Sequence, residues 1–275
     1  MSLKTAALAG TTATVAALLY VQRQRHERNV AERFAAASLE TLLNAIDAND
    51  AQTGAHVRRV ATYALILADA AGADTHEQRV VERVALFHDI GKIHEALFDI
   101  IHDEKRLNRS ERRAIATHPK RGAEVLRPLN GFYPELPEGV LSHHEKWDGT
   151  GYPRHLRGSR IPLAARIVSI ADTFDAVTHR RRYRGAQSVT AGLEVILAGR
   201  GTQFDPALVD LFAFPAVFER ITLAERRIGG WNEPVRQRRT GRDETNVPDI
   251  TFRWRPGRQG TRGHAASDRQ RQPPR

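Results

Sequence analysis

The chain has 275 residues, an ordinary apolar fraction of 41% and no cysteine. This length accommodates one sizeable domain with extensions, or two small domains. The lack of cysteine excludes disulfides, thiolate metal sites and a cysteine nucleophile. Any metal site must therefore use histidines and carboxylates, which favours iron, manganese or zinc in a catalytic role.

The formal net charge of +10 is carried by the two ends of the chain. Residues 1–37 contribute +3 and residues 215–275 contribute +7, which leaves the centre neutral. Sequence-independent binding to nucleic acid usually requires a basic face on the folded domain. We therefore expect no nucleic acid polymer as a partner.

The N-terminal segment, residues 5–21, carries no charge and is followed at once by several arginines. An uncharged span with a basic flank on its C-terminal side predicts a membrane anchor within residues 1–22 that leaves the rest of the chain cytoplasmic, at the inner face of the plasma membrane. The span is at the short limit for a bilayer, so an Ala-rich soluble helix is the alternative. Residues 23–39 are expected to form a connecting helix, which could pair with a second copy in a homodimer or be simply the first core helix.

The central domain is predicted over residues 40–214. Its apolar positions recur at intervals of three and four, which is typical of amphipathic helices. Several apolar runs end in polar residues: His88 and Asp89 follow one of them, and Asp172 follows another. No strand alternation or internal repeat is visible, so we predict an all-α fold.

The limits of these helices are marked by turn-forming residues. Gly91 and Lys92 suit a helix end, with Gly91 as C-cap and Lys92 opposite the negative end of the dipole. Residues 93–110 are irregular and charged, and we assign them to a loop without function. Beyond residue 214 the chain is rich in Arg, Gly and Pro, which predicts a basic, largely disordered tail over residues 215–275.

Histidines and carboxylates gather at the predicted helix boundaries. Burying a His-Asp pair after so apolar a run is costly without partners. A helix bundle builds such sites from several helices, and five histidines with two carboxylates can hold two divalent ions. Two adjacent ions polarise a phosphoryl group, generate a nucleophile and stabilise the leaving oxygen, which indicates a metal-dependent phosphohydrolase. The candidate ligands are His56, His88, Asp89, His118, His143, His144 and Asp172.

These residues, in this order over roughly residues 40–212, resemble the HD-GYP family, a branch of the HD-domain phosphohydrolases. The resemblance implies an HD-type helical bundle that hydrolyses cyclic di-GMP to pGpG or GMP, by a bridging hydroxide on two divalent ions, with iron or manganese expected. The matching segments are residues 50–60, 88–92, 118–122, 143–153, 171–184 and 201–206.

The resemblance also implies a role for each candidate ligand. Asp89 would bridge the two ions and take part directly in catalysis. One ion would be completed by His56, His88 and Asp172, and the other by His118, His143 and His144. Some members of the family have a Glu for a third metal where this chain has Gln52, so two ions are expected.

Four further residues would contact the substrate. Lys92 would act in catalysis and bind a substrate phosphate, Tyr152 would form a wall of the pocket, and Arg181 and Arg184 would hold the phosphates or guanine. Arg182 stands where the family usually has Pro, but no ligand is lost, so an active enzyme is expected. Two alternatives remain open: an HD phosphohydrolase for another nucleotide, and a catalytically silent module that binds cyclic di-GMP.

Overall fold

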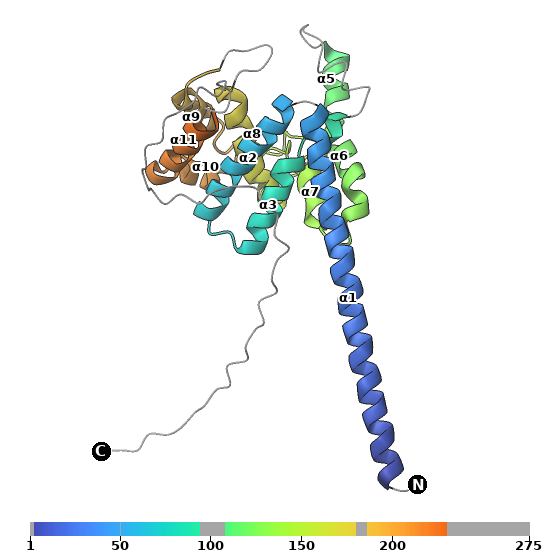
Figure 1. The fold of residues 1–275 in the computed structure, drawn as a ribbon. Coiled ribbons are helices and arrows are strands. Elements are labelled where there is room, and N and C mark those ends of the chain that lie inside the picture. The colour runs from blue at the N-terminus through green and yellow to red at the C-terminus, as the bar shows by residue number, and fades with distance from the viewer. Residues whose placement is uncertain (1–2, 50, 94–107, 180–185, 230–275) are drawn as a thin grey trace, which may run out of the picture. The chain divides into compact units, whose positions relative to one another are not determined.

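A computed structural model describes residues 3–49, 51–93, 108–179 and 186–229. Within these ranges the secondary structure is helical and contains no strand, which confirms the predicted all-α fold (Figure 1). The helices, with short 3-10 segments labelled η, are α1 (Leu3–Asn49), α2 (Ala51–Ala70), α3 (Thr75–Phe87), η1 (Ile90–Ile93), α5 (Arg109–Ile115), α6 (His118–Leu126), η2 (Arg127–Leu129), α7 (Glu135–Ser142), η3 (Gly158–Arg160), α8 (Leu163–Thr178), α9 (Val189–Ala198), α10 (Pro206–Ala213) and α11 (Pro215–Gly229).

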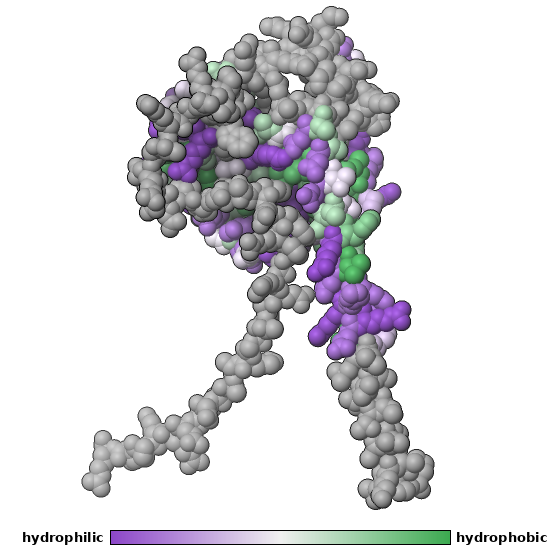
Figure 2. Space-filling model, viewed as in Figure 1, coloured by the Kyte–Doolittle hydropathy of each residue, from purple (hydrophilic) through white to green (hydrophobic). Residues whose placement is uncertain are grey.

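The chain divides into two compact units, residues 37–238 and residues 1–36 together with 239–275. In the smaller unit the described residues belong to α1. The i,i+4 ion pairs Arg23–Glu27 (2.7 Å) and Arg28–Glu32 (2.9 Å) lie on its surface, where Figure 2 shows hydrophilic side chains. Such pairs support an exposed helix.

The membrane anchor predicted within residues 1–22 and the connecting helix predicted over residues 23–39 are parts of this one continuous helix, α1. In the part of the chain that the structure describes, no helix combines the length and the apolar character that a bilayer crossing requires.

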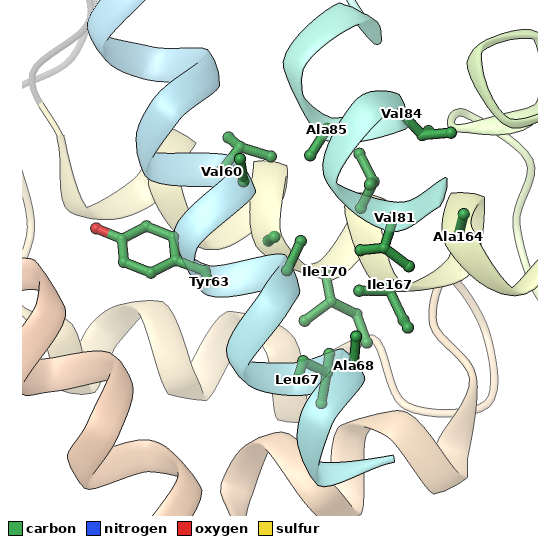
Figure 3. Packing of buried hydrophobic residues seen from close by; sticks show 14 of the residues in the cluster. Val60, Tyr63, Leu67, Ala68, Val81, Val84, Ala85, Ala164, Ile167 and Ile170 are labelled. Atoms are coloured by element: carbon green, nitrogen blue, oxygen red, sulfur yellow. The ribbon is translucent and has the colours of Figure 1, made fainter. Parts of the chain in front are cut away.

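The core of the larger unit lies where α2, α3 and α8 meet (Figure 3). Val60 and Leu67 of α2, Val84 of α3, and Ile167 and Ile170 of α8 are each fully buried there. On each helix the buried positions recur every three to four residues, so one face of each is apolar. Positions outside this apolar face can carry polar residues.

The last described helix, α11, corrects the predicted start of the tail at residue 215. Val217 and Ile221 lie four residues apart on α11 and are buried in the main core. The ring of Phe218 packs against the rings of Phe174 and Phe212, at centroid distances of 6.4 and 6.2 Å. The folded unit therefore extends through α11, and residues 230–275 lie outside the described ranges.

Gly91 is required for a reason other than the predicted helix C-cap. The C-cap of α3 is His88, in a right-handed helical conformation, and Gly91 lies in η1. A Cβ atom on Gly91 would lie 2.1 Å from the carbonyl oxygen of His118 and 2.6 Å from the nitrogen of Gly122. Glycine thus allows the first turn of α6 to pack directly on η1, which brings His118 beside Asp89.

Candidate metal centre

The structure brings all seven predicted ligands together at the ends or inner faces of five helices. Six of them form two groups of three, and within each group the ligand atoms lie within 4.8 Å of one another. One group comes from α2, the end of α3, and α8, and the other from the start of α6 and the end of α7. The first consists of His56, His88 and Asp172, and the second of His118, His143 and His144.

Asp89 lies between these two groups. Its Oδ2 is 3.4 Å from His88 Nε2 and 3.9 Å from His56 Nε2. Its Oδ1 is 3.2 Å from His118 Nε2 and 4.0 Å from His143 Nε2. The two oxygens of one carboxylate therefore face different groups, which is the arrangement a bridging ligand requires.

The imidazoles are oriented by hydrogen bonds at Nδ1. In His88, His118 and His143, Nδ1 lies 2.8, 2.8 and 2.6 Å from the carbonyl oxygen of the residue three positions earlier. Nδ1 must donate in each bond, so in the neutral imidazole Nε2 carries the lone pair that can bind a metal. His118 Nε2 and His143 Nε2 lie only 3.1 Å apart, so two lone pairs face one another. A cation would relieve this contact.

The buried Nε2 atoms of His56 and His88 have no hydrogen-bond partner among the described residues. Buried polar atoms without a partner are rare and indicate a missing ion or water. Together with the facing lone pairs of the second group, these atoms fit divalent ions bound through imidazole nitrogen and carboxylate oxygen.

Burial and neighbouring charges favour the metal-binding form of His143, His144 and Asp89. Burial lowers the pKa of His144 to about 4, and burial together with His144 holds the pKa of His143 well below its usual value. Both are thus neutral imidazoles at neutral pH. Burial alone would raise the pKa of Asp89, but Lys92 and His88 outweigh it and hold that pKa well below the usual range. Asp89 is therefore an ionised carboxylate.

A second layer of residues, which the sequence analysis did not identify as functional, supports His56. Asp175 on α8 is buried and accepts hydrogen bonds from Arg59 Nε (2.5 Å) and Nη2 (3.1 Å) and from His56 Nδ1 (2.7 Å). Arg59 follows His56 by three residues on α2, and Asp175 follows Asp172 by three on α8. A spacing of three puts the two residues of each pair on the same face of their own helix, and this is the signal that could have revealed Arg59 and Asp175.

The turn after His144 brings Tyr152 back to the metal centre. The ring of Tyr152 stacks on that of His144, with centroids 5.0 Å apart and planes 25° apart. The buried carboxylate of Glu145 closes the turn by accepting hydrogen bonds from the backbone nitrogens of Arg154 (2.6 Å) and Leu156 (3.0 Å). Tyr152 is thus fixed beside the second ligand group, where a pocket wall was predicted.

The predicted substrate residues are only partly described. Lys92 lies beside the centre, with Nζ 2.5 Å from Asp89 Oδ2 and 30% of its side chain exposed. Arg181 and Arg184 fall outside the described residues, as does most of the loop predicted over residues 93–110.

The described residues form helices that carry two His-rich groups, with one carboxylate between the groups. This arrangement is typical of a helical metal-binding protein. A family profile described as HD domain matches residues 40–208, well over half of the chain. The chain belongs to the HD-domain family, which confirms the family predicted from its sequence.

Three curated relatives illustrate the similarity. The 3'3'-cGAMP-specific phosphodiesterase 2 of Vibrio cholerae is 38% identical over 62% of this chain and 33% of its own length. The cyclic di-GMP phosphodiesterase response regulator RpfG of Xanthomonas campestris is 36% identical over 70% and 51%. A cyclic di-GMP phosphodiesterase of Vibrio cholerae is 35% identical over 63% and 38%. This chain thus spans a third to a half of the relatives it matches.

Proposed function

We propose that this protein is a metal-dependent phosphodiesterase that opens a cyclic dinucleotide, with cyclic di-GMP as its main substrate and pGpG or GMP as product. The observation that carries the proposal is the position of Asp89, with one oxygen toward each of two ligand groups. Two of the three relatives described above are named as cyclic di-GMP phosphodiesterases, which supports this substrate.

The proposed centre holds two divalent ions, iron or manganese, because its donors are imidazole nitrogens and carboxylate oxygens without sulfur. When bound, such a pair activates water, polarises the phosphoryl group and stabilises the leaving oxygen. Asp89 would contribute to both ions. One ion would be completed by His56, His88 and Asp172, and the other by His118, His143 and His144.

The remaining residues would orient the dinucleotide. The ammonium of Lys92 uses one donor on Asp89 and has two more for a phosphate oxygen, in a side chain that solvent reaches. Tyr152 presents an aromatic ring beside the centre, on which a guanine base can stack. We assign Arg181 and Arg184 to the phosphates or guanine, since guanidinium groups bind both.

A second substrate, 3'3'-cGAMP, is favoured by the names of three relatives, which are 35 to 38% identical to this chain. It differs from cyclic di-GMP in one base only, so the phosphodiester chemistry and the metal centre would be the same. The choice between them depends on base contacts, which a direct comparison of turnover on the two dinucleotides would measure.

The test is anaerobic hydrolysis by the full chain loaded with Fe²⁺ or Mn²⁺, with cyclic di-GMP, 3'3'-cGAMP and unrelated cyclic mononucleotides offered in parallel. Asp89→Ala should lower turnover by about 10³-fold or more, because loss of a bridging ligand removes several kcal/mol of transition-state stabilisation. Asp69→Ala, an exposed carboxylate on α2, is the matched control. Equal turnover in both variants would refute the site, and binding without cleavage in the wild type would show a silent module.

A further inference from the structure

A series of polar contacts connects α11 to the metal centre. Glu225 on α11 accepts a short hydrogen bond from the hydroxyl of Tyr63, and its Oε1 lies 3.3 Å from His179 Nε2. His179 Nδ1 lies 3.1 Å from Asp175 Oδ1. Asp175 in turn accepts the hydrogen bond from His56 Nδ1, at 2.7 Å. Three side chains thus separate α11 from the candidate ions.

These groups are buried enough for their pairing to matter. The side chains of Asp175, His179 and Glu225 are 2, 15 and 17% exposed. Each ring nitrogen of His179 faces one carboxylate oxygen, so the ring connects Asp175 to Glu225. Removing one member leaves a buried polar group without its partner, which is costly.

The contacts of His56 differ from those of the other oriented histidines. His88, His118 and His143 are each held by a carbonyl three residues earlier in the chain. His56 is held instead by Asp175, a residue of another helix. The direction of His56 Nε2, 3.4 Å from Asp172 Oδ1, therefore depends on what holds the Asp175 carboxylate in place.

We propose that Glu225 and His179 are positioning residues for the metal centre. Through Asp175 they fix the ring of His56 and so set the geometry of the ligand group that His56 shares with His88 and Asp172. The proposal rests on the proposed two-ion function. The residues matched by the HD-domain profile end at 208, and α11 begins at Pro215. Under this proposal a residue outside the matched region therefore acts on the metal centre.

The test measures metal binding by the full-length chain, stripped of metal and titrated with Mn²⁺ by calorimetry. The wild type should bind two ions. Glu225→Gln and His179→Gln should each weaken one of the two by about tenfold, at the lower end of the usual effect of residues that orient metal ligands, and leave the other unchanged. Glu219→Gln, an exposed glutamate on the same helix, should bind both ions as the wild type does.

A second variant separates positioning from simple anchoring of α11. Tyr63→Phe removes the other hydrogen bond to Glu225 but leaves the Glu225–His179 pair. It should lower the urea midpoint of unfolding and keep both Mn²⁺ affinities. If Glu225→Gln binds both ions like Glu219→Gln, or weakens both ions equally, the positioning role is refuted.

Hydrolysis of cyclic di-GMP by the wild type, measured beside the titration, distinguishes the two proposals. A wild type that binds two ions without turnover refutes the proposed function, while the comparison between Glu225→Gln and Glu219→Gln still decides the positioning role. Turnover together with unchanged metal binding in Glu225→Gln refutes the positioning role alone. A wild type that binds no Mn²⁺ overturns both.

Discussion

Replacing Gly91 by alanine should separate the two halves of the metal centre. Gly91 packs on the first turn of α6, and its added Cβ would meet two backbone atoms, the oxygen of His118 at 2.1 Å and the nitrogen of Gly122 at 2.6 Å. Backbone atoms at the start of a helix cannot rotate away as a side chain would. The start of α6 must therefore move as a unit, and His118 moves with it.

The size of this shift follows from the contact distances. Real Cβ contacts are essentially never shorter than 3.0 Å, so the His118 oxygen must recede by at least 0.9 Å from its present 2.1 Å. The separation of His118 Nε2 from Asp89 Oδ1, now 3.2 Å, should widen by a similar amount. Overpacking of this kind costs about 1–3 kcal/mol of stability. A displacement of about 1 Å at reacting groups costs about 100-fold in rate.

The assay compares Gly91→Ala with Gly131→Ala, since a Cβ on Gly131 meets no atom within 4 Å. Urea unfolding, Mn²⁺ titration and cyclic di-GMP turnover are measured for both. We expect Gly91→Ala to fold with reduced stability, to bind one ion more weakly and to lose about 100-fold in turnover. If its metal affinity and turnover equal those of Gly131→Ala, the packing of α6 on η1 does not set the distance between His118 and Asp89.

Three further outcomes are expected. Arg59→Met should lower the unfolding free energy by about 3–5 kcal/mol, because it leaves Asp175 buried without its guanidinium partner, whereas Arg200→Met should change urea unfolding little. In metal-free protein, the pKa of His144 is about 4 in the folded state and 6.5 in the unfolded state. The unfolded state therefore binds a proton more readily, and the free energy of unfolding falls as the pH drops from 6.5 toward 4. This loss is about 2 kcal/mol by pH 5, and the difference in pH slope between wild type and His144→Gln should show it. Chelation of bound metal should lower the melting temperature, and two equivalents of Mn²⁺ should restore it.

Five of the seven candidate ligands were predictable from sequence because they stand where an apolar run ends, whereas His56 and His118 lie near helix starts. Residues adjacent on a helix point about 100° apart, so His88 and Asp89 can reach one centre only from beyond a helix end. The structure ends α3 at Phe87 and places both residues just after it. The same reasoning applies to His143 and His144 after α7, which ends at Ser142.

Spacing places Arg59 on the face of His56 and Asp175 on the face of Asp172, but the contact between the two helices could not be predicted in this way. Arg59 and Asp175 pair across 116 positions, and Tyr63 reaches Glu225 across 162. Periodicity shows which face of a helix is buried, but it does not show which other helix covers that face. The start of the tail was wrong for a related reason: the average composition after residue 214 is polar, and it conceals the i,i+4 pair Val217 and Ile221.

The two ligand groups consequently differ in what builds them. His118 and His143 are oriented by hydrogen bonds to carbonyls three residues away, so their direction is set once the local backbone forms. His56 is oriented by Asp175, whose own position depends on contacts with Arg59, His179 and, through His179, α11. His88, His118 and His143 are thus oriented by local structure, whereas His56 is oriented by tertiary packing. Asp89, between the two ligand groups, belongs to both, which explains why the packing of η1 against α6 at Gly91 bears on the whole site.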